Sequence, residues 1–557
     1  MPSSYPPSPY LPQPRSAAKR TWSRLARLCA ILILLLGAML AGWLQVRAPR
    51  PAGLDAPAEA FSAARAMTDL AEIAKEPHPI GSPAHDEVRD YLLARLEHLG
   101  LKPEVQRTEI TPPWDPGLTA TVENLAVRIP GTDSTKAVMI AAHYDSVSRG
   151  PGAADDGAAI AAMLETARAL QASEPLRNDV ILLMTDGEEP GLLGAAAFVR
   201  GHPWAEDVGL VLNFEARGNR GPSLMFETSQ DNGWLVREFI KAAKEPLAYS
   251  LVYNVYKLMP NDTDLTVFRD GGLPGLNFAF GMGLNAYHQA IDTPERLDRA
   301  SLQHHGNCML DLTRHFGQAD LNDVRQKDRV YFNVFGWRML SYPESVSYWI
   351  LLFGALLFAA TLWHGMRGRR IGLKGIAGGL LASLAILGIV FAAVTLLWLA
   401  VRAIVPAAHY ESIVKELGVG AFYLIGLLLL ALAISALLVR RFTRRLRTEE
   451  LWGGVLLLWL LLGAAATFFL PGGSYLFLWP LIFSLLGLNV SLVLREGDWT
   501  WPAVLSAMPG YLLFTPIVYL VFVMITLDAA GAVLTIAALA VTLIYPLFGR
   551  MPRRGWS

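Results

Sequence analysis

The chain of 557 residues is too long for one ordinary domain, and 53% of its residues are hydrophobic, which excludes a wholly soluble protein. Its 48 basic and 48 acidic residues give no net charge, so the charge balance favours neither a nucleic acid nor an acidic partner. The two cysteines, one of them inside an apolar run, predict no disulfide framework. Any metal ligands must therefore come from His, Asp and Glu.

The N-terminal part combines a polar tail with one apolar segment. Residues 1–27 form a basic tail that we expect to be disordered and cytoplasmic, because its first 14 residues are rich in Pro, Ser and Tyr. Residues 28–46 are apolar over roughly 19 positions, enough to cross a hydrocarbon core of about 30 Å, so we predict a transmembrane anchor. A cleaved signal peptide is the alternative, because the segment has a basic front and an Ala-rich end. Residues 47–60 are typical of a linker.

The C-terminal part, residues 346–548, is predicted to be a bundle of seven transmembrane helices. Its apolar runs lie near residues 346–366, 376–401, 417–439, 451–470, 475–494, 503–526 and 529–548. Residues 321–345 form a connector before it and residues 549–557 a cytoplasmic tail after it. The segments on one side of the predicted membrane hold 18 Lys and Arg residues, whereas the short loops on the other side hold two, Arg402 and Lys415. The positive-inside rule therefore places both termini in the cytoplasm and residues 61–320 on the periplasmic or luminal side.

Residues 61–320 alternate apolar stretches with helical patterns, which predicts an α/β domain. The predicted strands are Ala137–Ala142, Val180–Thr185, Gly209–Phe214, Ser223–Glu227 and Gly275–Phe280. Asp86–Leu99 and Ala158–Leu170 have the apolar spacing of amphipathic helices. Because loops at strand ends converge on a crevice in such a sheet, polar residues that follow these strands are candidates for a ligand site.

Acidic residues and histidines follow the predicted strands in five clusters. In chain order they are His143 with Asp145, Asp155 with Asp156, Glu188 with Glu189, Glu215, and His288 with Asp292. Two imidazoles and several carboxylates without a thiolate suit Zn²⁺ in a hydrolytic site. A bridging carboxylate would let two ions each take three protein ligands, while another carboxylate accepts a proton from the shared water. Each cluster alone could be an ordinary strand end, turn or helix start, but their coincidence in one module indicates a metal site.

The order and local sequence of these clusters resemble metallopeptidase family 28, the co-catalytic di-zinc aminopeptidases. The resemblance spans about residues 61–312, beginning with PHPIGSPAHDEVRDYL and ending with YHQAIDTPERLDRASLQHHG. The added multi-span C-terminus looks like the branch of endoplasmic reticulum metallopeptidases and vacuolar membrane proteases. The resemblance implies a zinc-exopeptidase-like α/β domain with a central mixed β-sheet flanked by helices, plus one N-terminal and about seven C-terminal transmembrane helices.

The resemblance also implies two Zn²⁺ ions that share one carboxylate. Asp155 would bridge both ions. His143 and Glu215 would complete the ligands of one ion, and Glu189 and His288 those of the other. Many family members have Asp where this chain has Glu215, although Glu is usual in the membrane branch.

Further roles come from the same resemblance. Glu188 would be the general base, and Asp145 would orient the imidazole of His143. A cis peptide bond is implied between residues 155 and 156. Asp264, in a segment that only approximates the family's motif, could shape the substrate site. Tyr287 could either donate a hydrogen bond to the tetrahedral intermediate or simply pack.

We therefore expect a membrane-anchored zinc metallopeptidase that acts on peptides as an aminopeptidase, contacts the lipid bilayer and binds no nucleic acid. A single-zinc glutaminyl cyclase-like enzyme and an inert binding or scaffold protein are the alternatives, and the complete set of ligands with Glu188 disfavours both. A transporting bundle is disfavoured because the spans contain almost no ionisable side chains. Frequent Arg and Ala favour a bacterial inner membrane, with a eukaryotic endomembrane as the alternative. The sequence indicates no oligomeric state.

Overall fold

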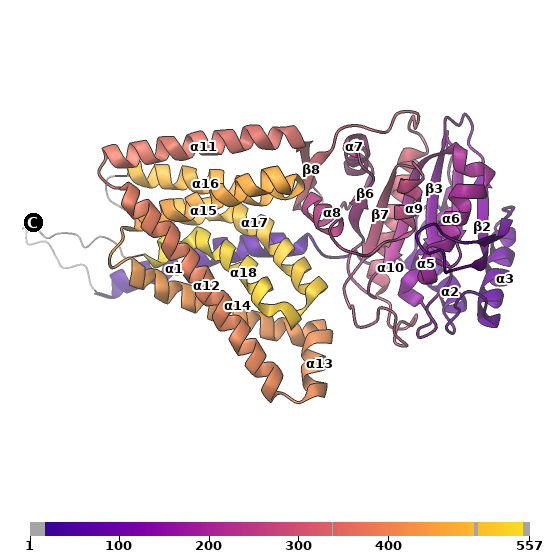
Figure 1. The fold of residues 1–557 in the computed structure, drawn as a ribbon, viewed down its shortest axis with the longest axis horizontal. Helices are drawn as coiled ribbons and strands as arrows, with labels where there is room; N and C mark the ends of the chain where they lie inside the picture. The colour runs from indigo at the N-terminus through magenta and orange to yellow at the C-terminus, as the bar shows by residue number, and fades with distance from the viewer. Residues whose placement is uncertain (1–16, 337, 495–498, 550–557) are drawn as a thin grey trace, which may run out of the picture.

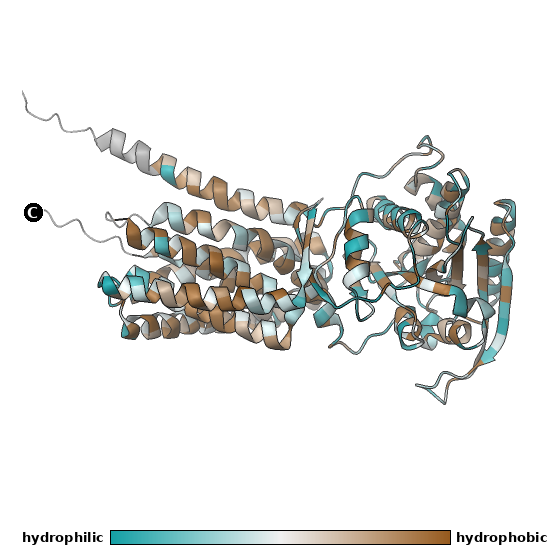
Figure 2. Ribbon diagram, turned by 90° about the horizontal axis from the view of Figure 1, so that it is seen from above, coloured by the Kyte–Doolittle hydropathy of each residue, from teal (hydrophilic) through white to brown (hydrophobic). Residues whose placement is uncertain are grey.

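The computed structural model describes residues 17–336, 338–494 and 499–549, and it shows two parts placed end to end (Figure 1). One part is an α/β domain and the other is a bundle of long helices. Hydrophobic residues dominate the helices of the bundle, whereas hydrophilic residues cover much of the α/β domain (Figure 2). The division agrees with the soluble and membrane modules that the sequence predicts.

A seven-stranded mixed sheet forms the centre of the α/β domain, in the order β1-β2-β4-β3-β5-β7-β6. Its strands are β1 (Glu104–Ile110), β2 (Ala120–Ile129), β3 (Ala137–His143), β4 (Val180–Thr185), β5 (Val208–Ala216), β6 (Leu224–Thr228) and β7 (Gly275–Phe280). The four strands β4, β3, β5 and β7 run parallel, and antiparallel strands flank them on both sides. The carboxyl ends of the four parallel strands therefore meet at one edge of the sheet.

Helices cover both faces of this sheet, which explains why the central strands are continuous apolar runs. In β3, Val138, Ile140 and Ala142 belong to the core under α2 (Ala63–Ile73), α4 (Ala158–Gln171) and α10 (Arg299–Phe316). The alternate residues Met139 and Ala141 belong to a second core under α6 (Leu193–Gly201) and α9 (Asp264–Asp270). Burial on both sides fixes the register of β3 and with it the position of His143 at its end.

All five predicted strands are present, with ends shifted by no more than two residues. The predicted helix at residues 86–99 begins earlier, as α3 (Pro83–His98), because Ser82 caps it and Pro83 occupies its first turn. The sequence analysis does not predict the edge strand β1 or its neighbour β2. It also missed a hairpin, β8 (Arg329–Phe335) with β9 (Arg338–Pro343), inside the predicted connector.

Eight helices of the described chain are long and apolar enough to cross a membrane, one near the N-terminus and seven after the α/β domain. They are α1 (Ala17–Leu44), α11 (Glu344–Arg367), α12 (Leu373–Ile404), α14 (Leu417–Phe442), α15 (Thr448–Phe469), α16 (Ser474–Val493), α17 (Thr500–Ile525) and the broken segment 527–548, which contains α18 (Ala530–Val541) and α19 (Tyr545–Phe548). The short helix α13 (Ala407–Lys415) lies in a connecting loop. Helix α1 begins at Ala17, so the disorder predicted for residues 17–27 is wrong, because the basic stretch continues the apolar helix. The rest of the predicted tails, residues 1–16 and 550–557, lies outside the described residues.

The α/β domain docks on the bundle through α8 (Ser250–Tyr256) and the β8–β9 hairpin. The hydroxyl of Ser250 lies 2.7 Å from the backbone oxygen of Gly472, in the turn between α15 and α16. Phe332 of β8 stacks on Tyr475 of α16 with ring centroids 4.3 Å apart. Leu247, Met282 and Phe332 share one buried core with the helices of the bundle. The two parts therefore meet through packed side chains as well as through the chain itself.

Candidate metal centre

The carboxyl edge of the parallel strands brings all five predicted ligands together. His143 is the last residue of β3, Glu215 lies near the end of β5, and Glu189 is in the one-turn helix α5 (Glu188–Gly191) after β4. Asp155 lies in the turn before α4, and His288 lies in the loop after β7. Residues far apart in the sequence meet here because the parallel strands end at the same edge.

Asp155 lies between two groups of ligand atoms. Its Oδ1 is 3.3 Å from Nε2 of His143, which is 3.7 Å from Oε2 of Glu215. Its Oδ2 is 3.1 Å from Nε2 of His288, which is also 3.1 Å from Oε2 of Glu189. Within each group the donor atoms lie no more than 4.8 Å from one another, a spacing that could hold a metal ion. One carboxylate thus offers a different oxygen to each group.

The electrostatics of this cluster fit divalent cations. Burial, reinforced by neighbouring carboxylates, raises the pKa of Glu188 and of Glu215 well above the usual value. Burial opposes a charge on His288, but its contacts with Asp155 and Glu189 outweigh that effect and raise its pKa to about 10. Among the described residues, Oε1 of Glu189 has no hydrogen-bond partner. Two imidazoles with carboxylates suit Zn²⁺, which would compensate the buried negative charge.

Asp145 supports this cluster in two ways. The Nδ1 atom of His143 lies 3.0 Å from the backbone oxygen of Asp145 and 3.5 Å from its carboxylate. The carboxylate also accepts the backbone N–H groups of Glu188, at 3.0 Å, and Glu189, at 3.3 Å. Gly187 precedes them with a φ of 68°, a conformation that favours glycine. Asp145 therefore contacts one histidine ligand and also fixes the turn that carries the two glutamates.

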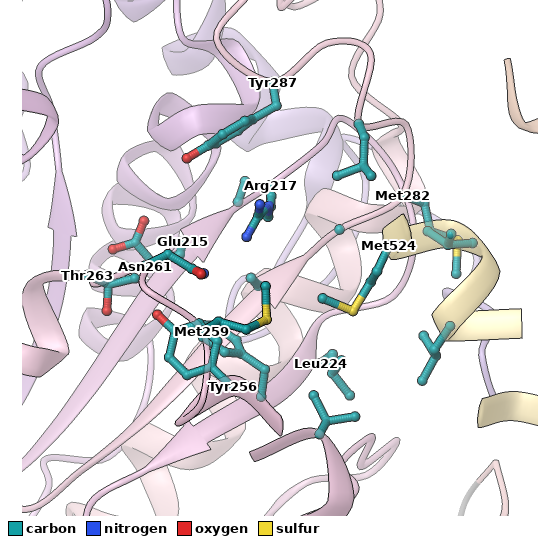
Figure 3. Close-up of a pocket in the computed structure, with 18 of the residues that line it drawn as sticks. Glu215, Arg217, Leu224, Tyr256, Met259, Asn261, Thr263, Met282, Tyr287 and Met524 are labelled. Carbon is teal, nitrogen blue, oxygen red and sulfur yellow. The ribbon is translucent and has the colours of Figure 1, made fainter. Parts of the chain in front are cut away.

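Two weaker candidates take different positions. Asp264 is buried and bonded to the hydroxyl of Thr185 at the end of β4, and burial raises its pKa to about 6. Its carboxylate contacts Thr185, and Asp264 does not line the cavity described below. Tyr287 stacks on His288 with ring centroids 3.8 Å apart and faces the cavity (Figure 3). The peptide bond between Asp155 and Asp156 is cis, as the resemblance implies.

Two side chains to which the sequence analysis assigns no role hold the candidate ligands in place. The Nδ2 atom of Asn213 donates to Oε1 of Glu215 at 3.1 Å and to Oδ1 of Asn277 at 3.0 Å. The carboxylate of Asp292 accepts the backbone N–H groups of Ala154, at 2.9 Å, and Asp155, at 3.2 Å. The amide of Asn213 stands inside the apolar run VLNFEA, and this is the sequence feature that could have indicated a buried polar role. Asp292 was noticed in its cluster but was given no role.

The fold and the site together gather candidate metal ligands at the carboxyl edge of a parallel sheet, an arrangement typical of hydrolytic metal sites. Residues 124–313 match the model of Peptidase family M28.

Curated relatives agree with this domain and with the membrane branch. Endoplasmic reticulum metallopeptidase 1 of Rattus norvegicus is 35% identical over 234 residues, which cover 40% of this chain and 26% of that protein. Vacuolar membrane protease of Candida dubliniensis is 34% identical over 311 residues, which cover 52% of this chain and 33% of that protein. The match thus spans between a quarter and a third of the length of these relatives.

Solved structures similar to the domain include two kinds of enzyme. An aminopeptidase from Aneurinibacillus sp. strain AM-1 is 13% identical with a TM-score of 0.39, and the match covers 46% of this chain and 94% of that one. A glutaminyl cyclase of Tannerella forsythia is 21% identical, also with a TM-score of 0.39, and the match covers 46% of this chain and 99% of that one.

Proposed function

We propose that this protein hydrolyses peptide bonds at a two-zinc site, as an aminopeptidase. The observation that carries the proposal is the position of Asp155, whose two oxygens face two separate sets of His and Glu ligands. One ion would be held by His143, Glu215 and Asp155, and the other by Glu189, His288 and Asp155. A single-zinc enzyme would need only one of these sets.

The two ions, when bound, would polarise the scissile carbonyl and lower the pKa of a water molecule. Glu188 lines one cavity together with Asp155, Glu215 and His288. Its carboxylate can therefore accept the proton of the attacking water and later deliver it to the leaving amine. The backbone N–H of Glu188 donates a hydrogen bond to Asp145, and this bond fixes the position of Glu188. The hydroxyl of Tyr287 can donate a hydrogen bond to the oxygen of the scissile carbonyl as negative charge develops there.

We further propose that the peptidase domain lies on the periplasmic or luminal side of an inner membrane or endomembrane, with both termini in the cytoplasm. The distribution of basic residues supports this orientation. The candidate membrane spans support a multi-pass membrane protein, and one of the relatives is named a vacuolar membrane protease. The bundle would then hold the active site at the membrane surface.

Metal content and product analysis on the purified full-length protein test this function. We expect about two zinc ions per chain at saturation and release of the N-terminal residue from free peptides but not from N-blocked ones. Glu188→Gln should abolish that release while retaining zinc. A single zinc ion at saturation, together with cyclisation of N-terminal glutamine, would instead identify a glutaminyl cyclase.

A further inference from the structure

The metal centre borders a cavity of about 260 Å³ whose wall comes from both parts of the protein. The polar end of this cavity contains the candidate ligands Asp155, Glu215 and His288 together with Glu188. Arg217 and Tyr287 also face it, with the guanidinium 5.7 Å from the centre of the tyrosine ring (Figure 3). A substrate bound at the metals would therefore extend into this space.

Most of the remaining wall is apolar. From the peptidase domain, β6 contributes Leu224 and Phe226, and α8 contributes Leu251 and Val255. Helix α8 is the same element whose Ser250 binds the turn of Gly472 in the bundle. The packing that joins the two parts thus also sets the shape of this cavity.

Helix α17 of the bundle closes the cavity from another side. Ile517, Leu520, Val521 and Met524 line it, a spacing of three and four residues that places them on one face of the helix. They lie in the last third of a candidate membrane span, at the end nearest the peptidase domain. Figure 3 shows the side chain of Met524 pointing toward the cavity from this helix, which is drawn in yellow. The bundle therefore supplies part of the substrate cavity.

We infer that this cavity binds a large apolar side chain beside the scissile bond and that α17 is a determinant of specificity. The inference rests on the proposed peptide hydrolysis and names its substrate class. Apolar walls favour an apolar side chain because its contact with water is removed on binding. An acidic side chain is disfavoured because burying its charge against these apolar walls costs free energy. The substrates are peptides with Leu, Met or Phe at this position, and the bundle recognises them in addition to anchoring the enzyme.

The test uses the zinc-loaded full-length enzyme in lipid nanodiscs and peptides that differ only in the residue beside the scissile bond. We expect kcat/KM for Leu, Met or Phe to exceed that for Gly or Asp by at least about tenfold. Val521→Phe fills the apolar end and should lower the ratio of kcat/KM for Leu over Gly by about tenfold. Met524→Ala widens the same wall and should shift the preference from Leu toward Phe.

Ile525→Phe is the matched control, because Ile525 follows Met524 on α17 but does not line the cavity. It should leave the ratio within about twofold of the wild type. Peptide cleavage without an apolar preference, or equal ratios in the Val521 and Ile525 variants, would overturn this inference and leave the hydrolysis standing. Failure to cleave any peptide with zinc bound would overturn both. If Val521→Phe does not fold, an unchanged preference in Met524→Ala overturns the role of α17.

Discussion

The carboxylate of Asp145 accepts a hydrogen bond from the backbone N–H of Glu188 at 3.0 Å. The same carboxylate also accepts the backbone N–H of Glu189. The turn that carries the two adjacent glutamates is therefore fixed, and their side chains point in different directions from it. The Oε2 atom of Glu189 reaches His288 at 3.1 Å, whereas Glu188 lies in the cavity near Glu215. Neighbours in the sequence are thus placed for different tasks, one as a ligand and one as a base.

The first prediction concerns the general base. Glu188→Gln keeps the size of the side chain but cannot accept a proton, so kcat should fall by at least about 10²–10⁴-fold. Zinc should stay bound. Steady-state kinetics and metal analysis on the same sample check both statements.

Glu189→Gln is the matched neighbour, and it should fail in a different way. It replaces an anionic ligand by a neutral amide, so zinc binding should weaken and added zinc should partly restore activity. Loss of zinc in the Glu188 variant with retention in the Glu189 variant would mean that their roles are exchanged.

The second prediction concerns the histidine ligands. His143→Ala and His288→Ala should each remove one of about three protein ligands of an ion, so zinc occupancy and most activity should be lost. His98→Ala on the exposed side of α3 is the control and should change neither quantity. Circular dichroism should show that all three variants stay folded. Normal turnover with full zinc in both ligand variants would refute the assigned site.

The sequence predicted the parts of this site that depend on local pattern. The strand β4 is a continuous apolar run buried on both faces, and its predicted limits are correct. His143, Glu189 and Glu215 lie at or near the ends of such strands, so the local pattern indicates these three as candidate ligands. The edge strand β1 was missed because its sequence EVQRTEI is polar and mostly exposed. The hydrogen bond from Asn213 to Asn277 and the position of Met524 in the cavity wall bring together segments distant in sequence, and only the folded packing reveals them.

The third prediction concerns Asn213, which donates to Glu215 from inside the sheet. Asn213→Ala removes this donor, so zinc affinity should fall by about 10–100-fold, the usual effect of losing a partner of a metal ligand. Asn213→Asp should weaken binding further, because it places a second carboxylate against Glu215. Competition with a chelator of known affinity measures the change. Asn178→Ala is a buried control remote from the ligands, and unaltered zinc affinity in Asn213→Ala would refute the positioning role.

The fourth prediction concerns removal of the metal. Zinc binds the folded site and not the dispersed ligands of the unfolded chain, so a chelator should lower the Tm of the peptidase domain. The stabilisation that is lost is about 2.7 kcal/mol when free zinc stands at 100 times its Kd. Differential scanning fluorimetry with and without chelator measures it, and readded zinc should restore the Tm. Glu189→Gln, which binds zinc weakly, should respond less than the wild type.

The last prediction concerns orientation in the membrane. In the structure the peptidase domain contacts the turn at Gly472 and the end of α17, so these segments lie on its side of the bundle. The segments at the opposite ends of the helices carry most of the basic residues, which favours a cytoplasmic position for them. A cysteine introduced at Glu174, exposed on the peptidase domain, should react with a membrane-impermeant maleimide in intact spheroplasts. A cysteine at Arg445, exposed in the opposite loop, should react only after lysis. The wild type is the background control, because Cys308 is buried and Cys29 lies within α1. The reverse labelling pattern would place the active site in the cytoplasm and refute the proposed topology.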